Sequence, residues 1–143
     1  MPLLREDQAT ISVPKLPVAL PFVRSWAKLE GGDLESEDTK VRPGGMLSQI
    51  NLGGPTTRTD ATVSRPYSAE LHPFLVPLEQ VAGNGSMNIT WTVLNAQRVS
   101  LGNTVTLTGI LKTVNRPAWD ANATAPAMLA LVMGCDVDAQ QTQ

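Results

Sequence analysis

The chain has 143 residues, enough for one domain with a core of its own. Charged residues make up 17% of it, the formal net charge is −2 and the basic residues are scattered, so no face is basic enough to bind nucleic acid through its phosphates. Because an average soluble domain has roughly 25% charged residues, the low fraction indicates that copies of the chain cover part of its surface. The alternative is an ordinary β domain with a threonine-rich exterior.

The lone cysteine and the apolar segments exclude further classes of protein. Cys135 lies in an apolar run, which favours a small buried side chain, and no disulfide can form within the chain. The longest apolar stretch, residues 125–135, is far shorter than the roughly 20 residues that span a bilayer. Residues 1–10 lack the continuous apolar segment of a secretory signal. We therefore expect a protein with no membrane partner that is assembled in the cytoplasm.

Residues 1–21 are expected to form an extended, irregular arm. They hold four prolines, and proline lacks the amide hydrogen that a sheet needs. The arm also has apolar residues that need burial, so we expect it to lie along its own domain or along a neighbouring subunit. The apolar residues are Ile11, Val13, Leu16, Val18 and Leu20.

Two segments of different polarity follow the arm. Residues 22–30 alternate like a strand, and residues 31–40 are expected to form a polar loop. A charge run like the one in this loop is usually only solvated, and the alternative is a projecting loop that docks on a basic patch of a partner subunit. Its acidic residues are Asp33, Glu35, Glu37 and Asp38.

Glycine pairs and a threonine-rich strand occupy the middle of the chain. Gly44-Gly45 and Gly53-Gly54 predict tight turns, and residues 45–52 a short strand. Residues 56–65 alternate and predict a longer strand. Because both faces of its first half are polar, this strand is expected to line a solvated channel or a seam between subunits, or else to be an exposed edge.

Residues 68–82 carry the only helical pattern. Leu71, Leu75 and Leu78 are spaced to share one helical face, and Ser68 is placed to cap the helix at its N-terminus. Two prolines within the segment predict that the helix is short or broken.

The remainder of the chain predicts β-structure. Residues 86–97 put Ile89, Trp91 and Val93 on one face, and residues 104–114 alternate in the same way. The apolar run that follows a loop at 115–126 predicts a central strand over 127–137, buried on both faces. The polar residues 138–143 are expected to form a flexible tail.

No group of residues marks a catalytic or metal site. His72 is the only histidine, and zinc usually takes several cysteine or histidine ligands, of which this chain has one each. Neither glycine pair opens a helix or precedes Gly-Lys-Ser/Thr, so neither forms a phosphate-binding loop. We therefore predict that the protein is not an enzyme and uses neither metal nor cofactor.

The order of these segments resembles that of the tail tube proteins of tailed bacteriophages and related contractile injection systems. The resemblance covers residues 22–137, with VRPGG at 41–45 and TVSRPY at 62–67 as its local markers. It implies a mainly β fold, namely a two-sheet β-sandwich or barrel with one short helix, an irregular N-terminal arm and a projecting loop. The chain is then divided into the arm at 1–21, a tube-like β domain at 22–137 and the tail at 138–143.

The resemblance implies a structural subunit of a viral tail tube. Six copies would form a ring that shares an inner β-barrel, and stacked rings would form a hollow conduit through which DNA is ejected without specific binding. A long hairpin loop and a terminal arm would bridge successive rings, with either 31–40 or 42–56 making the main axial contact. The partners would be further copies and tape-measure, terminator and baseplate or tail-tip proteins, in a virion tail assembled in the host cytoplasm.

Two sets of residues are candidates for these roles. The arginines of the first set are expected to act as ionic partners, and which strand face points into the lumen is left open. Candidates for subunit contacts are Ile11, Val13, Leu16, Val18, Asp33, Glu35, Glu37, Asp38, Arg42 and Arg58. Candidates for the lumen are Thr56, Arg58, Asp60, Thr62, Thr104, Thr106 and Thr108.

Three alternative functions stand beside this one. A monomeric β-sandwich that binds a ligand such as carbohydrate would use Trp119 and Tyr67. A hydrolase would use His72. Another ring-forming tail protein, such as a terminator or tube initiator, would give single rings and not long tubes.

Overall fold

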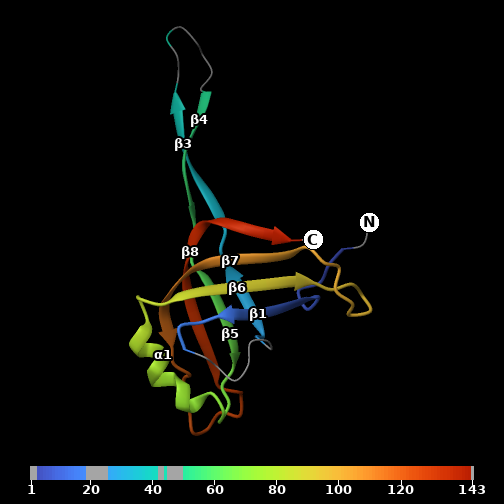
Figure 1. Cartoon of the computed structure of the whole chain (residues 1–143), viewed down its shortest axis with the longest axis vertical. Coiled ribbons are helices and arrows are strands. Elements are labelled where there is room, and N and C mark those ends of the chain that lie inside the picture. The colour runs from blue at the N-terminus through green and yellow to red at the C-terminus, as the bar shows by residue number, and fades with distance from the viewer. Residues whose placement is uncertain (1–2, 19–25, 42–43, 45–49, 143) are drawn as a thin grey trace.

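The computed structural model describes residues 3–18, 26–41, 44 and 50–142. Six of its strands form a curled sheet and two project from it as a hairpin (Figure 1). The mainly β fold with one short α-helix is confirmed. The elements in chain order are β1 (Ala9–Lys15), β2 (Lys28–Gly31), β3 (Leu34–Val41), β4 (Ile50–Arg58), β5 (Ala61–Pro66), the 3₁₀-helix η1 (His72–Phe74), α1 (Leu75–Val81), β6 (Ser86–Val93), β7 (Thr104–Asn115) and β8 (Met128–Thr142).

The large sheet curls into a half-barrel. Its strand order is β1-β6-β7-β8-β5-β2, and every neighbouring pair is antiparallel. An isolated bridge joins Ile11 of β1 to Trp26, just before β2. The curl therefore brings the two edge strands of the sheet towards each other.

One face of this sheet holds the core. Side chains alternate along a strand, and the alternation predicted for 86–97 and 104–114 is confirmed, with Met87, Ile89 and Leu107 buried. Leu78 of α1 packs against this face and helps to close it. The core residues are Val13, Trp26, Ala61, Val63, Leu78, Met87, Ile89, Leu107, Leu111, Leu131 and Met133.

The predicted burial of the last strand on both faces is wrong. Leu129, Leu131 and Met133 are buried, but Ala130 and Val132 between them are only half-buried on the opposite face. The side chains on that second face are also small or apolar, so the sequence shows one continuous apolar run, which led to the prediction of burial on both faces.

The helical segment is short and broken, as predicted. Pro73 lies in η1, and Pro77 lies in the first turn of α1, where a missing amide hydrogen removes no intrahelical bond. The predicted cap is wrong, because α1 begins after Phe74 without a side-chain cap. The Ser68 hydroxyl is instead buried, with no hydrogen-bond partner among the described atoms.

The polar loop predicted at 31–40 is a strand. β3 pairs with β4 from Leu34 opposite Arg58 to Val41 opposite Ile50. The register shifts at Gly54-Pro55, where a proline fits because the bulge leaves a backbone amide unpaired. The single strand predicted at 56–65 is divided at 59–60, so that its first part belongs to the hairpin and its second part is β5 in the large sheet.

Both termini of the described chain differ from the expectation. Residues 3–8 are irregular, but residues 9–15 form β1, and Pro14 falls within the register shift between Ser12 and Lys15. At the other end, β8 continues through residues 138–142 beside β7. These segments, expected as an arm and a tail, thus contribute strands to the same sheet as the rest of the domain.

Candidate assembly surfaces

The β3–β4 hairpin projects from the sheet along the longest axis of the molecule (Figure 1). Every described side chain on it is exposed except that of Arg58 at its foot. The described part of the hairpin holds three exposed acidic residues, Glu35, Glu37 and Asp38, and two bases, Lys40 and Arg58. A two-stranded hairpin is marginally stable alone in water, so this arrangement favours contact with another chain.

Arg58 fixes the foot of the hairpin to the large sheet. Its Nη1 donates a hydrogen bond to the carbonyl oxygen of Gly32 at 2.8 Å, and its Nε and Nη2 donate to that of Val137 at 3.1 and 2.9 Å. The backbone amide of Asp33 donates to the Thr59 hydroxyl at 2.8 Å beside it. Arg58 was expected to act as an ionic partner in subunit contacts. Its backbone acceptors were not predictable, because a sequence does not show which carbonyl groups lie near a side chain.

A second surface is the face of the large sheet opposite the core. Over β1, β6 and the first half of β7 most side chains on this face are hydroxyls or amides that stand opposite one another in register, and Ile110 and Lys112 follow further along β7. The hydroxyls of Thr92 and Thr104 lie 2.9 Å apart, and those of Thr90 and Thr106 lie 3.3 Å apart. Thr108 donates to the carboxylate of Asp136 at 3.3 Å. We call this the hydroxyl face; its residues are Thr10, Ser12, Thr62, Ser64, Asn88, Thr90, Thr92, Thr104, Thr106 and Thr108.

The same face carries one ion pair across β8. Lys112 of β7 lies 2.7 Å from the Asp60 carboxylate. Both side chains flank Gly134, because a Cβ there would stand 4.0 Å from each of them. The charges of Lys112 and Asp60 therefore cancel beside Gly134, where Ile110 is the third neighbouring side chain.

The structure thus brings five of the seven lumen candidates to one face of the sheet. They are Asp60, Thr62, Thr104, Thr106 and Thr108. The other two, Thr56 and Arg58, lie on the hairpin instead. The division of the predicted strand at 59–60 separates the two groups.

The apolar candidates of the N-terminal segment pack on their own domain. Val13 is part of the core, and Ile11, Leu16 and Val18 pack against it. Of the remaining candidates for subunit contacts, Arg42 lies outside the described residues.

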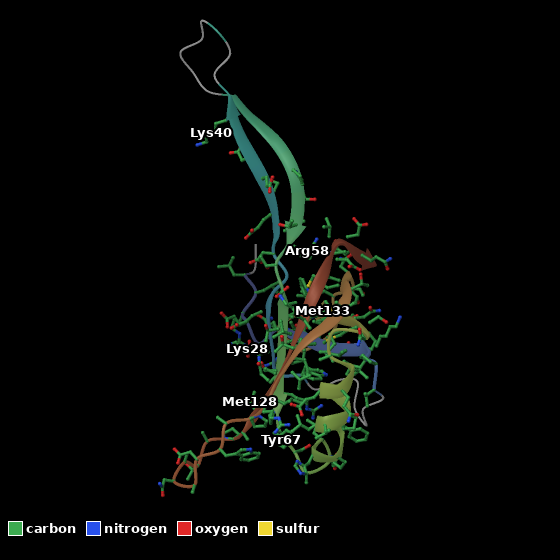
Figure 2. The ribbon with its side chains drawn as sticks, turned by 90° about the vertical axis from the view of Figure 1, so that its left-hand side faces the viewer. Lys28, Lys40, Arg58, Tyr67, Met128 and Met133 are labelled. Carbon is green, nitrogen blue, oxygen red and sulfur yellow. The ribbon has the colours of Figure 1, made fainter. Side chains whose placement is uncertain are left out.

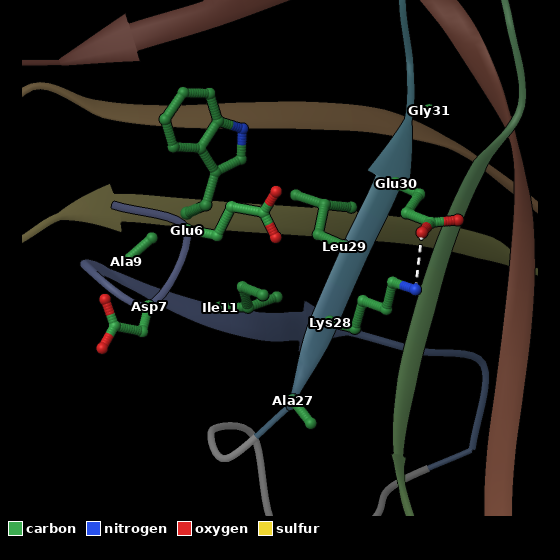
Figure 3. A pocket seen from close by; sticks show the side chains of 10 residues that line it. Glu6, Asp7, Ala9, Ile11, Ala27, Lys28, Leu29, Glu30 and Gly31 are labelled. Carbon is green, nitrogen blue, oxygen red and sulfur yellow. Dashed lines mark ion pairs between the residues drawn. The ribbon is translucent and has the colours of Figure 1, made fainter. Parts of the chain in front are cut away.

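A groove lies between the edge strands β1 and β2 (Figure 3). Ile11, Leu29 and Trp91 line it, and Lys28 is paired with Glu30 at 2.7 Å on one side. The hydrogen bond to Glu30 raises the pKa of Lys28. Within the described ranges, no group of three or more His, Cys, Asp or Glu side chains is placed to hold a metal ion, in this groove or elsewhere.

The aromatic candidates form a cluster at the end of the sheet away from the hairpin. Trp119 is 74% exposed, and its ring meets that of Tyr67 edge-on at 5.9 Å. The Tyr67 hydroxyl lies 2.7 Å from Nδ1 of His72. His72 therefore has a tyrosine as its side-chain partner among the described residues, and not the serine and carboxylate of a hydrolase.

The side chains of Glu79 and Cys135 also have shifted pKa values. Arg116 donates two hydrogen bonds of 2.7 Å to the Glu79 carboxylate, and these lower the pKa of Glu79. Burial raises the pKa of the Cys135 thiol, which makes this side chain an inert, half-buried hydrophobe at neutral pH. No helix in the described part of the chain is long and apolar enough to cross a membrane.

Known structures with the same fold come from contractile injection systems. No protein-family model matches the sequence, and a search of curated proteins finds no match either. A chain of the extended sheath–tube complex of an extracellular contractile injection system (PVC) has 15% identity and a TM-score of 0.73, over 98% of this chain and 91% of its own. A chain of the anti-feeding prophage (AFP) baseplate has 14% identity and a TM-score of 0.75, over 99% and 95%. A chain of the cap that terminates the AFP tube has 11% identity and a TM-score of 0.75, over 100% and 93%.

These likenesses define the class of the fold. The chain has the β fold found in tube, cap and baseplate assemblies of contractile injection systems. The predicted relation to tail tube proteins is therefore confirmed at the level of the fold. The PVC sheath/tube terminator also contains a chain with this fold, at 15% identity and a TM-score of 0.74 over 100% of this chain and 99% of its own.

Proposed function

We propose that this chain is a structural subunit of the hollow tube in a phage-like tail or contractile injection system. The observation that carries the proposal is a fold shared over nearly the whole chain with components of such assemblies. Copies associate side by side into rings, and rings stack into a tube. Six copies to a ring is the number we favour, and the six-fold symmetry applied to the AFP baseplate structure supports it.

In this proposal the hairpin makes the axial contact between rings. It projects along the longest axis (Figure 2). Its exposed Glu35, Glu37 and Asp38 form no ion pair with another described residue. Arg58 holds its foot through backbone carbonyls, so the hairpin leaves the sheet in a fixed direction. Residues 31–40 and 50–58 then act together in one hairpin.

The hydroxyl face is the surface that we assign to the lumen. Besides its hydroxyls the face carries the ion pairs Asp60–Lys112 and Lys28–Glu30. The register also places Lys15 on it, and the Asp136 carboxylate accepts a hydrogen bond from Thr108 there, so these charges balance in sign. Hydroxyl groups offer a passing polymer weak hydrogen bonds, and Lys112 and Lys28 are already paired with carboxylates, which weakens their attraction for phosphates. Such a lining suits a conduit through which DNA moves without being retained.

The partners in this proposal are further copies of the chain and other tail proteins. Cap and baseplate chains share its fold, so terminator and baseplate proteins are expected at the two ends of the tube, and a tape-measure protein in its lumen. The location is the virion tail or its injection-system counterpart, after assembly in the host cytoplasm.

A second candidate function is that of a terminating cap. The AFP cap and the PVC sheath/tube terminator contain chains with this fold, at TM-scores of 0.75 and 0.74. A cap protein closes a tube and would form a single ring by itself.

Sedimentation velocity of the purified chain over a range of concentrations tests the proposal. A tube subunit gives polymers that lengthen with concentration, a cap gives one ring of fixed size, and a monomer at all concentrations contradicts both. The double variant Glu35→Lys/Glu37→Lys should weaken polymerisation while the thermal melting of the monomer stays unchanged. The isosteric control Glu35→Gln/Glu37→Gln should have a smaller effect, and equal polymerisation of all three chains would contradict the axial role of the hairpin.

A further inference from the structure

Two exposed apolar patches lie at opposite ends of the large sheet. Figure 2 shows Arg58 at one end, where the hairpin begins, and Met128 at the other, where the connection from β7 enters β8. We call the first the hairpin foot, consisting of Leu34, Arg58 and Val137. We call the second the Trp119 ledge; its residues are Ala118, Trp119, Asp120, Ala123, Ala127 and Met128.

The hairpin foot combines two apolar side chains with one cation. Leu34 is 54% exposed and stands opposite Arg58 in the β3–β4 register. Val137 is 40% exposed, and its carbonyl oxygen accepts two hydrogen bonds from Arg58. The guanidinium is thus fixed to the backbone of Val137, on a β4 residue that stands opposite the exposed Leu34.

The Trp119 ledge is exposed but well anchored. The edge-on contact with Tyr67 positions the Trp119 ring, and the ion pair of Arg116 with Glu79 ties the start of the connection to α1. The Asp120 carboxylate accepts a hydrogen bond of 3.0 Å from the backbone amide of Asn122, which fixes the turn after Asp120. A groove beside the indole is lined largely by alanine side chains, which leave room for a partner to approach closely.

We propose that the Trp119 ledge of one copy packs on the hairpin foot of a second copy, head to tail. This contact rests on the proposed function, because it is the axial step that stacks one ring on the next. The two patches are complementary: Leu34 and Val137 meet the apolar groove, and the Arg58 cation meets the Trp119 ring and the Asp120 carboxylate. Because the patches are different and lie at opposite ends, repeating the contact gives an open stack along the axis and not a closed dimer.

A second copy suits the ledge better than a small polar ligand. Sugar sites need several convergent polar side chains, whereas this groove has one charged residue, Asp120, among alanines, a proline and a methionine. An anchored, exposed tryptophan at the centre of an apolar patch is instead typical of protein interfaces.

Heterotypic crosslinking tests the contact. In a Cys135→Ser background, Leu34→Cys and Ala123→Cys chains are made separately and treated with a short bis-maleimide, alone and mixed. The proposal predicts crosslinked dimers in the mixture and few in either chain alone. If one variant alone gave crosslinked dimers at the same yield as the mixture, the contact would be symmetric, and the proposal would be overturned.

Trp119 variants give an independent readout. Trp119→Ala should raise the concentration needed for polymerisation about tenfold or more, as for a tryptophan hot spot, and Trp119→Phe should raise it less. Tubes that form without the crosslink, or with Trp119→Ala unchanged, would overturn this contact and leave the tube function standing. A parent chain that neither polymerises nor crosslinks would overturn both, and binding of a soluble oligosaccharide that is lost in Trp119→Ala would replace the contact with a carbohydrate site.

Discussion

Substituting alanine for Gly109 tests how closely β7 and β8 pack at the centre of the sheet. A Cβ at Gly109 would run into the carbonyl oxygen of Gly134 and lie 2.9 Å from its carbonyl carbon and 3.1 Å from Cα of Cys135. All three atoms belong to the backbone, so no change of rotamer relieves the overlap. The two strands would have to separate at the register shift between Leu107 and Gly109.

The expected loss of stability is large for a single methyl group. Overpacking of a core costs typically 1–3 kcal/mol, and a backbone clash belongs at the upper end, so we expect Gly109→Ala to lose about 3 kcal/mol. For a domain near this size, that loss lowers the melting temperature by roughly 6–12 °C. Gly134→Ala is the matched control on the facing strand, because its nearest atoms would be 3.9–4.0 Å away.

Urea unfolding monitored by circular dichroism measures both variants against the parent chain. The control should stay within about 0.5 kcal/mol of the parent. Because both substitutions are glycine to alanine, their effects on the unfolded chain cancel in the comparison. A Gly109→Ala chain as stable as the Gly134→Ala chain would refute the register of these two strands.

Three further predictions concern surface groups. Arg58→Lys should reduce polymerisation, because one ammonium cannot reach two carbonyl oxygens in the geometry of the guanidinium fork; polymers equal to those of the parent would argue against a fixed hairpin. Because Arg116 lowers the pKa of Glu79, their pair stabilises the fold above the ordinary glutamate pKa of 4.5 and loses this contribution as the pH falls through the lowered value. Arg116→Ala should therefore raise the Glu79 pKa in an NMR titration, and an unchanged pKa would contradict the pair. Trp119→Phe should remove the most red-shifted part of the tryptophan emission, since Trp26 is buried, and an unchanged spectrum would place Trp119 inside the protein.

The half-buried strands were predictable because one face of each is apolar. In β6 and β7 the buried residues fall at every second position over part of each strand, so the alternation in the sequence gives both the strand and its inner face. They are Met87 and Ile89 in β6, and Leu107, Gly109 and Leu111 in β7. The same alternation placed Thr104, Thr106 and Thr108 together on the outer face. The broken helix was equally predictable, because two prolines stand in an otherwise helical pattern.

A hairpin between rings was expected from the family resemblance, but its strand β3 was predicted as a loop, because neither face of the hairpin is buried within one chain. Apolar and polar residues alternate in a sequence when one face of a strand is buried. β3, with its run of acidic residues, has no such apolar face. β1 was missed because Pro14 argues against a strand, although it falls where the register with β6 shifts. The role of Arg58 at the foot was beyond prediction, since its acceptors are backbone carbonyls far along the chain.

The division of residues 56–65 between two surfaces was also not predicted. Residues 56–65 form one polar alternating run in sequence, but the chain changes from hairpin to sheet at Thr59 and Asp60. Thr56 and Thr62 therefore belong to different surfaces. A turn without glycine or proline at its centre leaves little trace in the sequence.

Negative-stain electron microscopy of the purified chain at high concentration tests the central claim most directly. The proposed function predicts hollow tubes, or stacked rings with a central hole and six-fold end views. Featureless monomers that persist after tail-assembly partners are added would contradict it.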